Sequence, residues 1–77
     1  RTDLLHLSEI IKKHSIQQLM LPVVFLKILA ESNLEIGYFS SLREIITAGE
    51  QLIITPAIRL FFTQLPACSL YNYYGPS

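Results

Sequence analysis

The pattern of apolar and polar residues divides the chain into three segments of helical periodicity and three short apolar runs. The first segment, residues 4 to 14, has its apolar side chains on one helical stripe and follows two good N-cap residues, Thr2 and Asp3. Its last turn is basic, which complements the partial negative charge of a helix C-terminus. The pattern predicts an amphipathic helix with His6 and His14 at its surface.

Two further segments are also predicted to form helices. One is largely apolar and begins at Pro22, because proline is tolerated at the first helical position; Asn33 is its expected C-cap. The other begins with Thr55 as N-cap and Pro56 at the first helical position. Its apolar stripe ends before Pro66, so this segment carries the clearest start and stop signals in the chain.

Short apolar or β-branched runs separate these helices, and their length suits buried strands better than helices. The expected strands are residues 16–21, 42–48 and 69–72. Residues 33–41 show no sustained period and are expected to form a surface connection that Tyr38 and Phe39 anchor to the body.

The resulting order, α-β-α-β-α-β, is typical of an α/β fold in which helices cover a parallel sheet. Both β-α-β connections should be right-handed. The pattern leaves the order of the strands open. Nothing in residues 1–77 marks an internal domain boundary or a repeat.

Composition indicates a piece of a larger protein. Hydrophobic residues make up 51% of the 77 residues and charged residues 16%, whereas about 25% charged is usual for a soluble domain. The chain also begins at Arg1 rather than Met. A sheet separated from its neighbours would expose edges and apolar faces, so self-association is expected.

Charge and motifs exclude several classes of function. Six basic and six acidic residues balance, so the chain has no net positive charge to attract nucleic acid or an anionic membrane. No apolar stretch reaches the length of a membrane span, so a cytoplasmic protein is the default. Cys68 is the single cysteine and is expected to be a small buried hydrophobe. Walker, dinucleotide-binding and nucleophile-elbow motifs are absent from the sequence.

The candidate chemistry lies where the expected strands end, because ligands of open α/β sheets bind outside the carboxyl ends of the strands. These ends comprise residues 21–22, 48–50 and 72–77. Asn72 offers the donor and the acceptor that a purine edge can use, and the ring of Tyr73 or Tyr74 can stack on a base. These ends therefore suggest half of a nucleotide site, although a Tyr-rich turn that only caps a strand remains an alternative.

Two of these strand ends resemble a known family. Residues 42–52 (LREIITAGEQL) and 72–77 (NYYGPS) strongly resemble the adenylation domains of nonribosomal peptide synthetases, within the adenylate-forming enzyme superfamily. Residues 19–24 and 54–57 are similar to the same family at matching spacing. The resemblance implies that residues 1–77 are one partial adenylation domain.

The implied parent enzyme joins an amino acid to AMP, with ATP and Mg²⁺, and loads the product on the phosphopantetheine thiol of a carrier protein. The family's motif continues after Ser77 with an acidic residue that binds Mg²⁺. The fragment alone is therefore expected to be inactive and to hold no cofactor. No catalytic residue or metal ligand is assigned to it.

The resemblance also implies roles for single residues. Its nucleotide-binding positions match Gly49, Glu50, Asn72, Tyr73, Tyr74 and Ser77. Its substrate-pocket positions match Leu19, Ile46, Ala48, Tyr73 and Gly75. The segment Met20-Leu21-Pro22 departs from the family's commoner double-proline form, which could shift the register of Leu19 by one residue.

Two other functions remain open on the sequence alone. A small non-catalytic nucleotide-binding or interaction module could share the same strand-end geometry. A structural scaffold that associates through exposed apolar faces would not require Asn72 or Tyr74.

Overall fold

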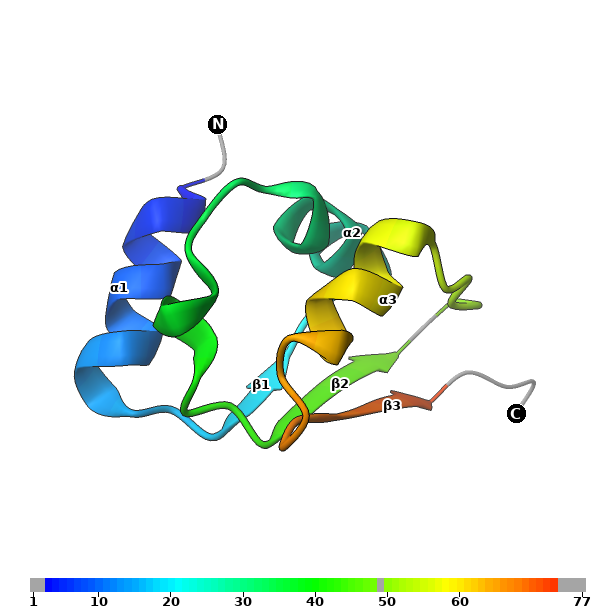
Figure 1. The fold of residues 1–77 in the computed structure, drawn as a ribbon. Coiled ribbons are helices and arrows are strands. Elements are labelled where there is room, and N and C mark those ends of the chain that lie inside the picture. Colours follow the sequence, from blue (N-terminus) through cyan, green and yellow to red (C-terminus); the bar gives the residue numbers. More distant parts are fainter. Residues whose placement is uncertain (1–2, 49, 74–77) are drawn as a thin grey trace.

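Three parallel strands alternate with three α-helices along the chain (Figure 1). The computed structural model describes residues 3–48 and 50–73. Its elements are α1 (Leu4–His14), β1 (Gln18–Met20), α2 (Val23–Glu31), the 3-10 helix η1 (Ile36–Phe39), β2 (Glu44–Ala48), α3 (Pro56–Thr63) and β3 (Ser69–Tyr73). The expected α/β class and element order are confirmed. None of the helices in the described ranges is long and apolar enough to cross a bilayer.

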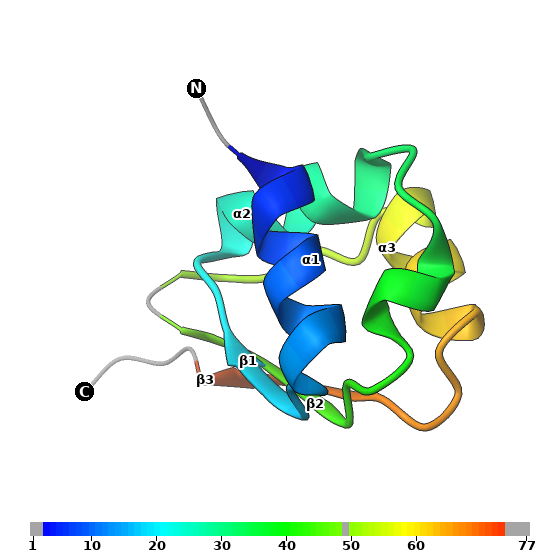
Figure 2. The same ribbon diagram turned by 90° about the vertical axis from the view of Figure 1, so that its left-hand side faces the viewer.

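The sheet has the strand order β1-β2-β3, with β2 in the centre and both pairs parallel. Ile45 lies opposite Leu19 on one side and Leu70 on the other. Both connections advance in the same direction across the sheet and are right-handed, so α2 and α3 lie on the same face (Figures 1 and 2). No helix of the described chain covers the opposite face, which we call the open face.

The hydrophobic core lies between the helices and the covered face of the sheet. Ile45 of the central strand is fully buried there, and Leu19 and Leu70 pack against the same cluster. The rings of Phe39 and Phe61 meet edge to face, with centroids 5.5 Å apart, a favourable geometry for aromatic pairs. The largest fully buried apolar side chains are Phe39, Ile11, Leu26, Leu29, Leu42, Ile45 and Ile58.

Capping side chains begin two of the helices as the sequence predicts. The Asp3 carboxylate accepts a hydrogen bond from the His6 backbone N–H at 3.1 Å. The Thr55 hydroxyl accepts from the Ile58 N–H, also at 3.1 Å, and Pro56 follows at the first helical position.

Two predicted boundaries of α2 are wrong by one residue. Pro22 is the N-cap rather than the first helical residue, and its extended ψ of 152° keeps it outside the helix. The C-cap is Ser32 and not Asn33, because the Ser32 hydroxyl donates to the Leu29 carbonyl at 2.8 Å and ends the helix one residue earlier.

The connection between α2 and β2 is more ordered than its sequence indicated, since it contains η1. Phe39, at the end of η1, is only 1% exposed and belongs to the core, which confirms its predicted role as an anchor. Tyr38 also contacts α1, with the Lys12 Nζ 5.4 Å from its ring centroid. The connection therefore joins α1 to the body as well as α2 to β2.

Replacing Phe39 with Ala should lower the free energy of unfolding by about 3 kcal/mol or more, because truncation of a buried Phe leaves a cavity. Phe25→Ala removes the same side chain from a partly exposed position of α2, 37% exposed, and should cost clearly less. Urea titrations followed by circular dichroism measure the difference. Equal losses in the two variants would show that Phe39 is not an anchor.

Candidate functional site

The carboxyl ends of the three strands lie side by side, as the sequence predicts. The Leu21 backbone N–H donates to the Ile46 carbonyl at 2.9 Å, which joins the end of β1 to β2. Ala48 lies opposite Tyr73 at the ends of β2 and β3. Four predicted site residues lie outside the described residues: Gly49, Tyr74, Gly75 and Ser77.

On the helix-covered face, the end of the sheet carries a polar pair. The Thr47 hydroxyl donates to the Asn72 side-chain oxygen at 2.8 Å, and the two residues are register partners on β2 and β3. Thr47 is completely buried, so the Asn72 amide provides a hydrogen-bond partner that this hydroxyl needs. The bond holds the amide in one orientation and leaves its two N–H donors and a second acceptor position for a ligand.

On the open face, the end of the sheet is apolar. Ile46, Ala48 and Tyr73 share this face because their side chains alternate with those of Ile45 and Thr47, which face the helices. Tyr73 is 66% exposed. The structure thus brings together three of the predicted substrate-pocket residues.

Leu19, the fourth described residue of that predicted set, lies on the other face. Its register partner is the buried Ile45, and it packs against the core beneath the helices. Leu19 is therefore separated from Ile46 and Ala48 by the sheet itself. Tyr73, predicted for both the nucleotide and the substrate sides, lies on the open face opposite Ala48.

Glu50 lies just beyond the end of β2 and is exposed. It borders a hollow of about 330 Å³ between the start of α2 and the connection from β2 to α3. The other lining residues are Val23, Val24, Lys27, Gln51, Ile53 and Thr55. Glu50 is thus close to the strand ends, on the side of α2.

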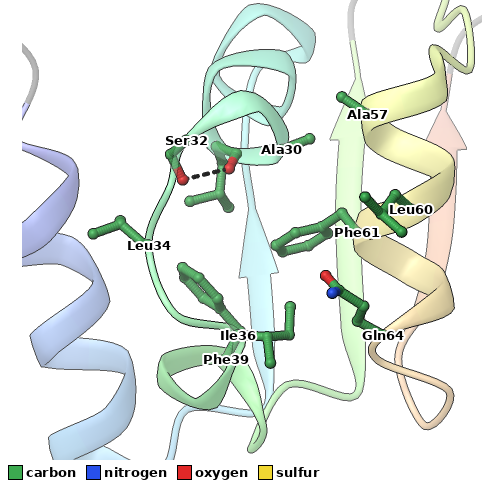
Figure 3. A pocket seen from close by; sticks show the side chains of 10 residues that line it. Ala30, Ser32, Leu34, Ile36, Phe39, Ala57, Leu60, Phe61 and Gln64 are labelled. Carbon is green, nitrogen blue, oxygen red and sulfur yellow. Dashed lines mark hydrogen bonds between the residues drawn. The ribbon is translucent and has the colours of Figure 1, made fainter.

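A second cavity lies in the helical layer, away from the strand ends. It measures about 100 Å³ and is bordered by α2, η1 and α3 (Figure 3). Eight of its ten lining residues are apolar, and the Ser32 hydroxyl already donates to the Leu29 carbonyl. We interpret this cavity as a packing gap between helices.

Cys68 precedes β3 at the opposite end of the sheet and is buried, as predicted. Burial raises the pKa of its thiol; Arg43 lowers this pKa and Glu44 raises it. The thiol is therefore protonated at neutral pH and acts as a packing residue. Within the described ranges, no group of three or more His, Cys, Asp or Glu side chains gathers to hold a metal.

Sequence reasoning missed Thr47 as a residue of the site. Its β-branched side chain contributed only to the prediction of a strand, since threonine is common in strands. The available signal was its place two residues after the buried Ile45, which puts both on one face. Its hydrogen bond depends on a register partner 25 residues away.

Comparison with curated proteins identifies the family. Gramicidin S synthase 2 of Brevibacillus brevis is 34% identical over 76 residues, which cover 97% of the chain, and the protein of that name from Aneurinibacillus migulanus matches equally well. Tyrocidine synthase 2 of Brevibacillus parabrevis is 40% identical over 68 residues, or 87% of the chain. The chain is part of a nonribosomal peptide synthetase adenylation domain. It spans about 2% of the length of these relatives. No model of a known protein family matches it.

Solved structures agree with this assignment at the level of the fold. The N-terminal subdomain of Klebsiella oxytoca NpsA has been solved with anthranilyl-AMSN and with 3-hydroxybenzoyl-AMSN. These structures match 99% of the chain with TM-scores of 0.68 and 0.69, at 19% and 18% sequence identity. The chain covers 19% and 18% of theirs. The synthetase segment therefore has the fold of part of that subdomain.

The buried Cys68 thiol should react slowly with a thiol reagent in the native chain and rapidly after unfolding in urea at the same pH. Because burial raises its pKa, the thiolate fraction stays below that of an ordinary cysteine. The native rate should therefore continue to rise as the pH increases beyond about 8.5, the usual thiol pKa. Equal native and unfolded rates at pH 7 would show that Cys68 is accessible.

Proposed function

We propose that this chain forms the strand-end wall of an amino-acid adenylation site within a larger synthetase. The parent enzyme joins the carboxylate of an amino acid to the α-phosphate of ATP and releases pyrophosphate. It then passes the aminoacyl group from the aminoacyl-AMP to the phosphopantetheine thiol of a carrier protein. The observation that carries this proposal is the meeting of the polar Thr47–Asn72 pair and the apolar Ala48–Tyr73 pair at adjacent strand ends, in a chain of this family.

In this proposal Asn72 binds the amino group of adenine. Its side-chain oxygen accepts from Thr47 and has a second lone pair available, so it can accept from the base without losing the internal bond. Gly49 and Glu50 line the adenine, and the ring of Tyr74 stacks on it. Such stacking contributes about 1 to 3 kcal/mol per base at nucleic-acid sites.

The substrate side of the proposed site uses the open face. Ile46, Ala48 and Tyr73 pack against the side chain of the amino acid, and the Gly75 backbone lies near its amino group. A tyrosine at position 73 fills space that a smaller residue would leave open. This part of the wall therefore limits the size of the substrate.

The phosphate end of the proposed site depends on Ser77 and on Mg²⁺. Ser77 contacts the α-phosphate, where a hydroxyl donor favours the charge that develops during transfer. Mg²⁺ supplies further neutralisation of phosphate charge when it is bound. The described residues provide no cluster of ligands for it, so their share of the chemistry is to bind and orient the base and the amino acid.

A small nucleotide-binding or interaction module is the alternative function. It would use the same strand ends without any adenylation. The match of 97% of the chain to synthetases about fifty times its length favours the adenylation site over this alternative.

The complete synthetase that contains this chain should catalyse amino-acid-dependent exchange of pyrophosphate into ATP, and residues 1–77 alone should not. The isolated chain lacks the family's phosphate-binding and catalytic segments. Both proteins can be assayed in parallel with all twenty common amino acids. Exchange by the isolated chain would show that it is not a partial site. No exchange by the synthetase with any amino acid would contradict the proposed activity.

Thr47→Val in the synthetase should raise the KM for ATP about 3- to 10-fold. This variant keeps the shape of the side chain but removes the donor that orients Asn72, and a typical hydrogen bond contributes about 0.5 to 1.5 kcal/mol. Thr47→Ser retains the hydroxyl and should restore the KM. The KM for the amino acid should change little in either variant. An unchanged KM for ATP in Thr47→Val would show that the pair does not position a nucleotide ligand.

A further inference from the structure

The three lysines of the chain lie at different ends of the sheet. Lys12 and Lys13 belong to the last turn of α1, which leads to the amino end of β1. Lys27 is in the second turn of α2, a helix that begins three residues after the end of β1. Figure 2 shows the start of α2 on the same side of the molecule as the ends of β2 and β3. Lys27 is therefore the lysine beside the candidate site.

Lys27 also borders the hollow that reaches the end of β2. This hollow measures about 330 Å³, and its lining includes Lys27 on α2 and Glu50 in the segment after β2. Both residues are exposed, and Ile53, which also lines the hollow, is 69% exposed, so the space is open to solvent. Its volume lies within the usual range of small-molecule sites, about 300 to 1,000 Å³. A small molecule formed at the strand ends can thus enter the space next to the lysine amine.

The proposed reaction forms a small molecule that reacts with amines. An aminoacyl-AMP is a mixed anhydride, and an amine can attack its carbonyl carbon as the thiol of a carrier protein does. When the unprotonated Nζ of a lysine attacks, an amide C–N bond forms and the C–O bond to the phosphate breaks. AMP leaves with that electron pair, and the proton of the amine passes to water. The reaction needs no other reactant.

We propose that Lys27 is a self-modification site, which the synthetase aminoacylates when no carrier thiol takes up the aminoacyl-AMP. This inference rests on the proposed adenylation function. The shared hollow carries it, because Glu50 lies just beyond the end of β2 and lines the adenine in the proposed site. Lysine carries its amine on a flexible four-carbon stem, so Nζ can reach into the hollow from α2. Aminoacylation would lengthen this side chain and fill part of the space next to Glu50.

The test uses the complete synthetase with its carrier in the apo form, which has no phosphopantetheine thiol. The enzyme is incubated with ATP, Mg²⁺ and an isotope-labelled form of the amino acid that supports the strongest pyrophosphate exchange. Peptide mass spectrometry then measures aminoacylation at each lysine. Lys27 should carry about tenfold more label than Lys13, since an intermediate formed nearby reaches Lys27 at a high effective concentration. Hydroxylamine should not remove the label, because it cleaves thioesters and leaves amides intact.

Two variants and a change of carrier provide the controls. Lys27→Arg keeps the positive charge but replaces the amine, so it should lose the label at this position and keep pyrophosphate exchange. Lys13→Arg makes the same change at the opposite end of the sheet and should leave the label at Lys27 unchanged. A carrier that bears its phosphopantetheine should lower the label at Lys27, because its thiol competes for the aminoacyl group.

The outcomes separate this proposal from the proposed function. Equal labelling of Lys13 and Lys27 would show that the aminoacyl-AMP reacts only after release into solution, which would overturn the role of Lys27. Pyrophosphate exchange without label at Lys27 would also overturn that role and leave the adenylation function intact. Absence of exchange in the unsubstituted synthetase would overturn the adenylation function and this proposal with it.

Discussion

The register between the parallel strands is the constraint on which the candidate site depends. Side chains alternate between the two faces of each strand. A shift of the strand pairing by one residue would therefore move the side chains that now face the helices to the open face, and the reverse. Backbone hydrogen bonds define this register. The Gln17 carbonyl accepts from the N–H groups of Arg43 and Glu44 at 2.7 and 3.0 Å, and the Leu21 N–H donates to Ile46 at the other end of β1. These contacts place Met20, and not Leu19, beside Ile46.

Consecutive residues consequently serve different purposes. On β2, Ile46 and Ala48 lie on the open face of the sheet, where Ile46 is only 8% exposed, while Thr47 between them points toward the helices and donates to Asn72. In the proposed site the same strand end thus contacts the amino acid with one face and orients the adenine-binding residue with the other. A small change in the backbone of β2 would disturb both contacts, which links recognition of the two substrates through one short strand.

Local signals in the sequence were sufficient for the order of the three α-helices and three strands but not for η1 or for the pairing of distant residues. The caps at Asp3 and Thr55 and the apolar periodicity predicted α1 and α3 closely, because these features act within one or two turns of a helix. The anchoring role of Phe39 was predicted, but its partner was not, since its segment has no periodicity and Phe61 lies 22 residues away. The Thr47–Asn72 bond and the face of Leu19 likewise depend on contacts between distant segments.

The two faces of the sheet also differ in how much their apolar side chains can still contribute to the free energy of ligand binding. Leu19 is partly buried against the core, so much of its apolar surface already stabilises the fold. Met20 and Tyr73 remain largely exposed. Covering their apolar surface gains roughly 25 cal/mol for each Å² removed from water. A substrate that covers this surface obtains that free energy on binding, and the gain depends on how well its side chain matches the shape of the open face. The exposed apolar area of Met20 and Tyr73 is therefore still available for contact with a ligand, whereas most of the apolar contact of Leu19 is already made within the fold.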